Sequence, residues 1–167
     1  MTADLIVTPG GAWFRGRRIG RSIGRTGITR TKREGDGATP AGHLRVLRML
    51  FRPDRIAPAA LPRWAEPIGR LDLWSDDPRD PAYNHLVRAP HPFSHEGLRR
   101  GDGLYDLILV TDWNHPRARP GAGSAIFLHA WRGPARPTEG CIALAPADLR
   151  RIAATLRPGA VILVRGG

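Results

Sequence analysis

Cysteine is nearly absent from this chain, since Cys141 is the only one among 167 residues. A single cysteine excludes a disulfide within the chain, so its thiol is free for chemistry in any compartment. Buried free cysteines are common, and Cys141 could equally be a small apolar residue of the core. The residues around it must therefore decide between a structural and a chemical role.

Long apolar runs are also lacking. No stretch reaches the length of about 18 apolar residues that a membrane-spanning helix needs. Residues 1–9 have neither the basic start nor the apolar run of a secretory signal peptide. The contents of glycine (20) and proline (16) leave little room for long helices and favour many short strands joined by turns. We expect one mostly β domain over residues 1–167, large enough for a core.

Negative charge is scarce, with 15 acidic against 26 basic residues and a net charge of +11. No acidic residue occurs from Leu5 to Arg33, where basic residues accumulate. This pattern indicates either affinity for a polyanion or a solvated basic face. Because no zinc finger, RNA-recognition signature or basic helix interleaved with aromatics is present, nucleic acid is not an expected partner. A carboxylate-rich peptide is a simpler one, since a guanidinium binds a carboxylate through two hydrogen bonds.

Two short strand-like runs surround the lone cysteine. Residues 124–131 alternate between two faces, and His129 lies on the same face as its aromatic neighbours. Cys141 begins a second run, residues 141–144. Adjacent strands would bring His129 within hydrogen-bond distance of Cys141. A thiol becomes a strong nucleophile as the thiolate, which a nearby imidazole favours, so this is the pattern of a catalytic pair.

The residues on either side of the cysteine strand support this interpretation. Gly140 has no side chain, so the backbone can turn sharply there and its N–H can point at a developing oxyanion. Pro146 suits the first position of a helix, and Asp148 suits the positive end of the helix dipole. Apolar residues at helical spacing then predict an amphipathic helix packed on the sheet; they are Leu149, Ile152, Ala153 and Leu156.

Other strands follow from the same patterns. We expect a hairpin from residues 5–7 to 13–14, a broken strand pair over 20–31, a strand over 44–51, a central strand over 104–111 and a terminal strand over 160–164. Eight prolines from Pro53 to Pro92 exclude long helices there and imply an ordered excursion over the sheet.

Other candidates for chemistry are weaker. The remaining histidines show no metal-ligand spacing, so neither a metal nor a cofactor is expected. His95 and Glu96 form a predicted loop pair that could bind or polarise a substrate, or simply be a polar turn after Pro92.

The residues around Cys141 resemble the YkuD-type L,D-transpeptidases of bacterial peptidoglycan. The family signature is a strand histidine, a short gap, and Ser/Thr-His-Gly-Cys followed by a polar residue. Here His129, Thr138, Gly140 and Cys141 match it, and residues 32–42 resemble the family segment Asp-Gly-x-Thr-Pro-x-Gly. The resemblance also takes in residues 76–84 and 123–129.

The chain departs from the family pattern at two positions beside the nucleophile. Glu139 stands where many members have histidine, and Ala143 where many have arginine or asparagine. The gap from His129 to Cys141 is also shorter than usual. The catalytic pair is untouched, but recognition next to the nucleophile is expected to be altered, which leaves open the peptide bond that is attacked.

The resemblance implies a YkuD-like β-sandwich of mixed sheets with one or two short helices, including one after the cysteine loop. It implies that Cys141 attacks a stem-peptide carbonyl at an L-centre while His129 takes the thiol proton. Backbone N–H groups of Gly140 and Cys141 would hold the oxyanion. The carbonyl of Ala130 would orient His129, and no cofactor is implied.

Substrate contacts are expected from the connection between His129 and Cys141, from the segment 76–84 and from the His95–Glu96 pair. These candidates are Tyr83, His95, Glu96, Trp131, Arg132, Arg136, Thr138 and Glu139. The expected partners are peptidoglycan stem peptides, and the expected state is a monomer in the periplasm or at the cell wall. Since no export signal is visible, a shortened sequence, a different start and another export route all remain open.

Three outcomes remain open for the activity. An amine from a second stem would resolve the thioester into a crosslink, whereas water would make the protein a carboxypeptidase or endopeptidase. A non-catalytic domain of the same fold that binds cell wall or polyanions is the third alternative.

Overall fold

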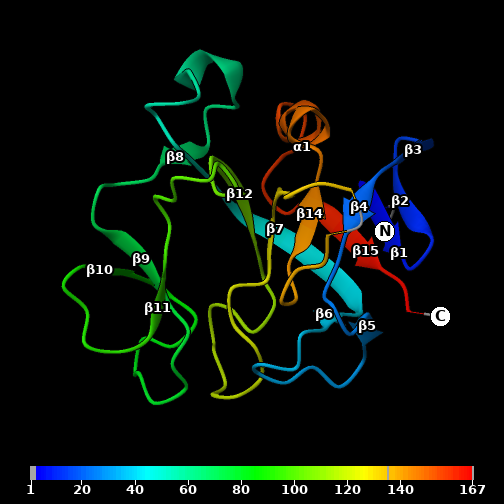
Figure 1. Cartoon of the computed structure of the whole chain (residues 1–167). Helices are drawn as coiled ribbons and strands as arrows, with labels where there is room; N and C mark the ends of the chain where they lie inside the picture. The colour runs from blue at the N-terminus through cyan, green and yellow to red at the C-terminus, as the bar shows by residue number, and fades with distance from the viewer. Residues whose placement is uncertain (1–2, 135, 167) are drawn as a thin grey trace.

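The computed structural model describes residues 3–134 and 136–166. In this part of the chain most ordered elements are strands, arranged in three sheets with one α-helix and one turn of 3₁₀ helix (Figure 1). The strands are β1 (Leu5–Thr8), β2 (Gly11–Phe14), β3 (Arg17–Ile19), β4 (Arg21–Ser22), β5 (Ile28–Thr29), β6 (Thr39–Pro40), β7 (Gly42–Phe51), β8 (Ala65–Pro67), β9 (Asp72–Ser75), β10 (Leu86–Arg88), β11 (His95–Gly97), β12 (Leu107–Thr111), β13 (Phe127–Ala130), β14 (Ile142–Leu144) and β15 (Val161–Val164). The helices are η1 (Pro58–Ala60) and α1 (Pro146–Ala153).

The main sheet has the strand order β3-β2-β1-β15-β7-β12-β13-β14-β4, and β8 pairs with β7 beside this path. It is mixed, because β1 runs parallel to β15 and β13 runs parallel to β14, while β7 pairs antiparallel with both of its neighbours on this path. Strand β7, ten residues long, joins the two halves of the main sheet, since β15 pairs with the first part of β7 and β12 with the second. The site strands β13 and β14 therefore lie in one half of a continuous sheet.

The centre of the main sheet is covered on both faces. All five residues of β12 are buried, as in a central strand. Leu107 and Leu109 belong to one hydrophobic cluster, and Ile108 and Val110 to the other. The first cluster includes α1, and the second includes Trp74 of the three-stranded sheet β10-β9-β11. Two sheets thus pack face to face, which is the expected sandwich.

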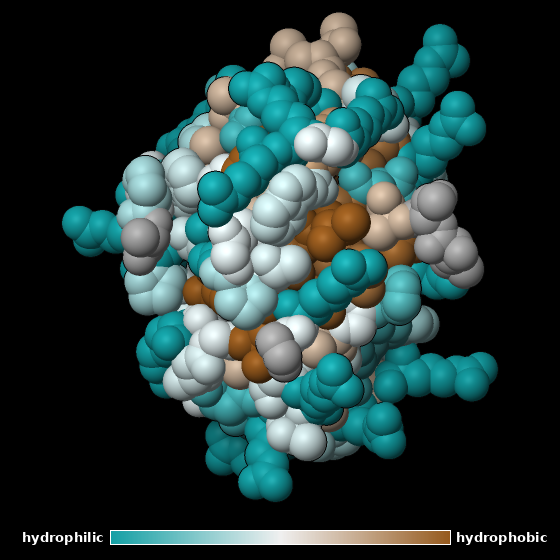
Figure 2. All heavy atoms as spheres, turned by 90° about the vertical axis from the view of Figure 1, so that its right-hand side faces the viewer, coloured by the Kyte–Doolittle hydropathy of each residue, from teal (hydrophilic) through white to brown (hydrophobic). Residues whose placement is uncertain are grey.

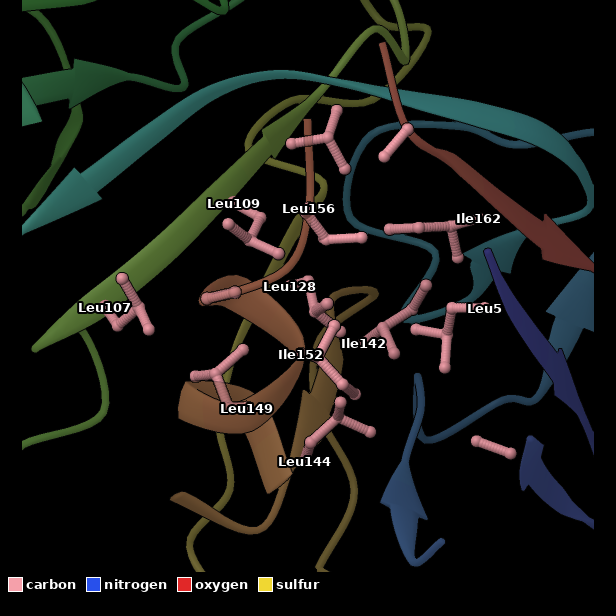
Figure 3. Close-up of a cluster of buried hydrophobic side chains, with 14 of the residues drawn as sticks. Leu5, Leu107, Leu109, Leu128, Ile142, Leu144, Leu149, Ile152, Leu156 and Ile162 are labelled. Atoms are coloured by element: carbon pink, nitrogen blue, oxygen red, sulfur yellow. The ribbon is translucent and has the colours of Figure 1, made fainter. Parts of the chain in front are cut away.

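Helix α1 supports the strand that follows the cysteine. It begins at Pro146, and its buried residues Leu149 and Ile152 pack with Ile142 and Leu144 of β14 in the first cluster (Figure 3). Burying one such side chain stabilises the fold by about 2 kcal/mol. The predicted helix is confirmed, although it ends at Ala153, so the fourth predicted residue, Leu156, joins the same cluster from beyond the helix.

Most of the predicted strands are confirmed as β1, β2, β7 and β15, and the proline-rich stretch contains short strands and η1 but no long helix. Three expectations are corrected. The central strand begins at Leu107, because Asp102 accepts the Leu104 N–H and closes a turn before it. The strands in residues 20–31 pair with β14 and β6 and not with each other. His95 and Glu96 lie on strand β11 and not in a loop.

Basic side chains cover much of the surface over the first strands. Arg15, Arg17 and Arg18 are exposed around the β2–β3 turn. Hydrophilic side chains project from the side of the molecule that carries β1–β3 and β15 (Figure 2). Within the described residues, no helix is both long and apolar enough to cross a membrane.

Candidate active site

The pairing of β13 with β14 brings the histidine and the cysteine to one cavity. The strands run parallel with His129 opposite Ala143, and Cys141 directly precedes β14. Both residues line a cavity of about 420 Å³, a size typical of pockets for small ligands. The other candidate residues that line it are His95, Glu96, Trp131, Arg132, Arg136, Thr138 and Glu139.

The thiol of Cys141 is held by the backbone of the neighbouring strand. Its Sγ donates to the carbonyl oxygen of Ala125 at 3.0 Å and accepts from the Phe127 N–H at 3.4 Å. Although Cys141 keeps some exposed surface, its sulfur lies against these packed groups. Burial and the charge of Glu96 raise the pKa of the thiol to about 12, so it is neutral at rest.

The imidazole of His129 is oriented by the carbonyl next to it. Its Nδ1–H donates to the oxygen of Ala130 at 2.7 Å, which leaves Nε2 as the unprotonated nitrogen. Burial lowers the pKa of His129 to about 4, and the hydrogen bond to Ala130 only partly opposes this shift. The ring of Tyr105 packs edge-on against it, with centroids 5.2 Å apart. His129 is therefore a fixed neutral base at neutral pH.

The expected hydrogen bond between the two candidate catalytic side chains is not formed in this structure. Among the described residues, the partners of the Cys141 thiol are Ala125 and Phe127 and not His129. A neutral thiol is a weak donor that takes the acceptor beside it, and the Ala125 carbonyl is that acceptor. The pair is thus a neutral thiol and a neutral imidazole that share a cavity.

Ala125, which accepts from the thiol, is itself held by a buried amide. It has a positive φ of 50°, an uncommon value for a residue other than glycine, and its N–H donates to Asn84 Oδ1 at 2.9 Å. Asn84 Oδ1 also accepts from the Trp74 indole, and its Nδ2 donates to the carbonyls of Trp113 and Asn114. The sequence analysis did not single out Asn84, although it lies in the segment that resembles the family.

The turn before Cys141 does not present the Gly140 N–H as the expected oxyanion donor. The Gly140 N–H donates to Thr138 Oγ1 at 3.2 Å, and that hydroxyl donates to the carbonyl of Cys141 at 2.6 Å. The Gly140 N–H is therefore engaged within its own turn. Glycine is required there because φ is +142° and a Cβ would lie 2.8 Å from the oxygen of Ala38.

One wall of the cavity contains a half-buried acid, Glu96. The hydroxyl of Tyr105 donates to Glu96, and the Arg100 guanidinium lies 5.2 Å from the centre of the Tyr105 ring. Burial raises the pKa of Glu96. Tyr105 and Arg100 both line the cavity but were not among the predicted site residues, because neither belongs to a motif near Cys141 in the sequence.

The rim of the cavity is formed by the connection between the two strands. Arg132, Arg136 and Glu139 are exposed, and Glu139 forms an ion pair with Arg25. Trp131 packs against Gly20, where an added Cβ would lie 2.7 Å from the indole. The rim thus presents two guanidinium groups beside an aromatic ring.

Tyr83 is not brought to this group of residues. It is buried, and its hydroxyl donates to Glu34, which also accepts from Ser124 at 2.8 Å. Within residues 3–134 and 136–166, no cluster of three or more His, Cys, Asp or Glu is placed to hold a metal ion.

The model of one protein family matches residues 8–164, and that family is the YkuD L,D-transpeptidase catalytic domain. The chain belongs to this family. No curated protein matches it. A solved L,D-transpeptidase from Mycobacterium smegmatis is similar at 14% identity with a TM-score of 0.45. That match covers 98% of this chain and 59% of the other chain, and at this level of similarity it adds nothing about activity.

Proposed function

We propose that this domain forms crosslinks between peptidoglycan stem peptides through a thioester on Cys141. The observation that supports this most directly is the cavity lined by both the only thiol of the chain and a neutral, oriented His129. Membership of the YkuD family supplies the reaction class. Under this proposal residues 1–167 form one catalytic domain that works as a monomer in the periplasm or at the cell wall.

The first half-reaction forms the acyl-enzyme. The Cys141 thiol turns from the Ala125 carbonyl to the substrate carbonyl, and His129 Nε2 takes its proton as the C–S bond forms. The Cys141 N–H stabilises the oxyanion, since the Gly140 N–H is engaged by Thr138. The C–N bond then breaks, His129 returns the proton to the leaving amine, and a thioester remains.

The second half-reaction consumes the thioester. The amine of a second stem attacks the carbonyl, a new amide forms, and the proton lost by that amine returns the sulfur to a thiol through His129. Water attacking in place of the amine would release a shortened stem. Both outcomes use the same residues, so the choice depends on whether the cavity admits the acceptor and excludes water.

Defined tetrapeptide and tripeptide disaccharide stems test this proposal. We expect mass spectrometry to detect dimers. The residue released will identify the peptide bond attacked. Because Glu139 and Ala143 depart from the family pattern, we expect that bond to lie at an unusual donor position. Shortened monomers without dimers would show a hydrolase. Neither product, together with a Cys141 that does not react with thiol reagents in the folded protein, would show a binding domain.

The rim arginines are expected to bind stem carboxylates. Loss of both side chains in an Arg132→Ala, Arg136→Ala variant should raise KM for the stem peptide about tenfold, because each guanidinium–carboxylate bond is charge-assisted. Alkylation of Cys141 should change much less. An Arg63→Ala, Arg70→Ala variant is the matched control, since it removes the same charge from exposed positions outside the cavity. An equal rise of KM in both variants would contradict a specific role of Arg132 and Arg136 in binding the stem carboxylates.

A further inference from the structure

Lys32 is the only lysine among the 26 basic residues of the chain. An ammonium is a compact charge, whereas the guanidinium used everywhere else is broad and planar. Lys32 lies between β5 and β6, and its side chain is only 3% exposed although the surrounding segment is strongly basic. The use of lysine at this one buried position, in a chain whose other basic residues are all arginine, indicates that the position needs a compact charge.

The aliphatic part of Lys32 packs against Gly123, and its ammonium lies behind the turn that precedes Cys141. A Cβ built on Gly123 would lie 3.1 Å from both Cγ and Cε of Lys32. At its end, Nζ lies 3.5 Å from the corresponding Cβ position of Gly140, the residue before the nucleophile. The ammonium is fixed there by hydrogen bonds to the carbonyl of Arg33, at 2.9 Å, and to the carboxylate of Asp36.

Asp36 does not cancel this charge at the loop. Burial alone would raise its pKa, but hydrogen bonds from Lys32 and from the N–H groups of Ala38 and Arg33 outweigh it and lower the pKa, so Asp36 is ionised. Its side chain is 24% exposed against 3% for Lys32, so water screens the carboxylate more than the ammonium. The Lys32 ammonium behind Gly140 is therefore less screened by water than the carboxylate that pairs with it.

Two charges near the thiol act in opposite directions. The pKa of Cys141 is raised by burial and by Glu96 and lowered by the Phe127 N–H and by Lys32. Glu96 lines the open cavity, whereas Lys32 lies on the protein side of the loop. No substrate bound in the cavity need displace Lys32, so its charge is available throughout the reaction.

We propose that Lys32 is a positioning residue for the nucleophile, whose buried ammonium fixes the Gly140–Cys141 turn and stabilises negative charge as it develops on Sγ. The role of Cys141 as the nucleophile rests on the function proposed above. The action of Lys32 on the thiol does not, because alkylation of Cys141 needs no stem peptide.

The test is the rate of Cys141 alkylation by iodoacetamide at neutral pH. Lys32→Met keeps the packed stem and removes the charge. We expect its rate to fall about tenfold, because less of the thiol is ionised once the ammonium is lost. Arg33→Met is the matched control, because it removes the same charge from the adjacent exposed side chain and should leave the rate unchanged.

Two further variants separate charge from shape. Lys32→Arg keeps the charge and should keep most of the wild-type rate, and Asp36→Asn removes the opposing charge and should raise the rate. An unchanged rate in a folded Lys32→Met protein would overturn the proposal. Equal rates in Lys32→Met and Lys32→Arg would also overturn it. A lowered rate in Asp36→Asn would do the same, and it decides the matter if Lys32→Met does not fold. Stem peptides that give no product would affect only the proposed function.

Discussion

Cys141→Ala is expected to abolish both crosslinking and hydrolysis of purified muropeptides without unfolding the domain. No second thiol exists in the chain to form the covalent intermediate, and alanine removes only the sulfur and its two weak backbone hydrogen bonds. Product formation is measured by mass spectrometry, and folding by the thermal transition, which should move by only a few degrees.

A carbapenem provides an independent readout of the same thiol, as the family resemblance implies. Intact mass should show one adduct on the wild-type protein and none on Cys141→Ala. Turnover that survives in the purified alanine variant would rule out the thiol mechanism.

His129→Ala is expected to reduce turnover by about 10²–10⁴-fold, the range for a positioned acid–base group. It should also slow alkylation of Cys141 near neutral pH, because the imidazole no longer accepts the thiol proton. His43→Ala is the control, since His43 is exposed on β7 and does not line the cavity. Unchanged turnover and alkylation would make His129 a core residue only.

The lowered pKa of His129 also predicts the acid side of the pH profile. Protonated imidazole cannot take the thiol proton, so activity falls as the pH drops through the pKa of His129. With that pKa at about 4, kcat/KM should stay level from pH 7 to about pH 5 and then decline. A decline centred at about 6.5, the ordinary value for histidine, would show that the ring is solvated in the working enzyme.

Local patterns were sufficient for much of the fold. The alternation over 44–51 and the helical spacing after Pro146 each describe a segment whose apolar face must be buried, and both appear as β7 and α1. The same logic predicted adjacent strands around His129 and Cys141, and the structure pairs β13, which carries His129, with β14, which begins directly after Cys141. Signals of this kind depend on residues close in sequence.

The sequence by itself determined the mostly β class, the helix after Cys141, and the two side chains that share the cavity. The tertiary structure alone decided what each polar group binds: the thiol bonds to Ala125, Tyr83 to Glu34, and the Gly140 N–H is taken by Thr138. It also placed Lys32 behind a loop more than a hundred residues away in the chain. Periodicity in the sequence indicates only which face of an element is buried. The partner of a hydrogen bond or of a charge depends on how segments that are remote in the sequence pack together.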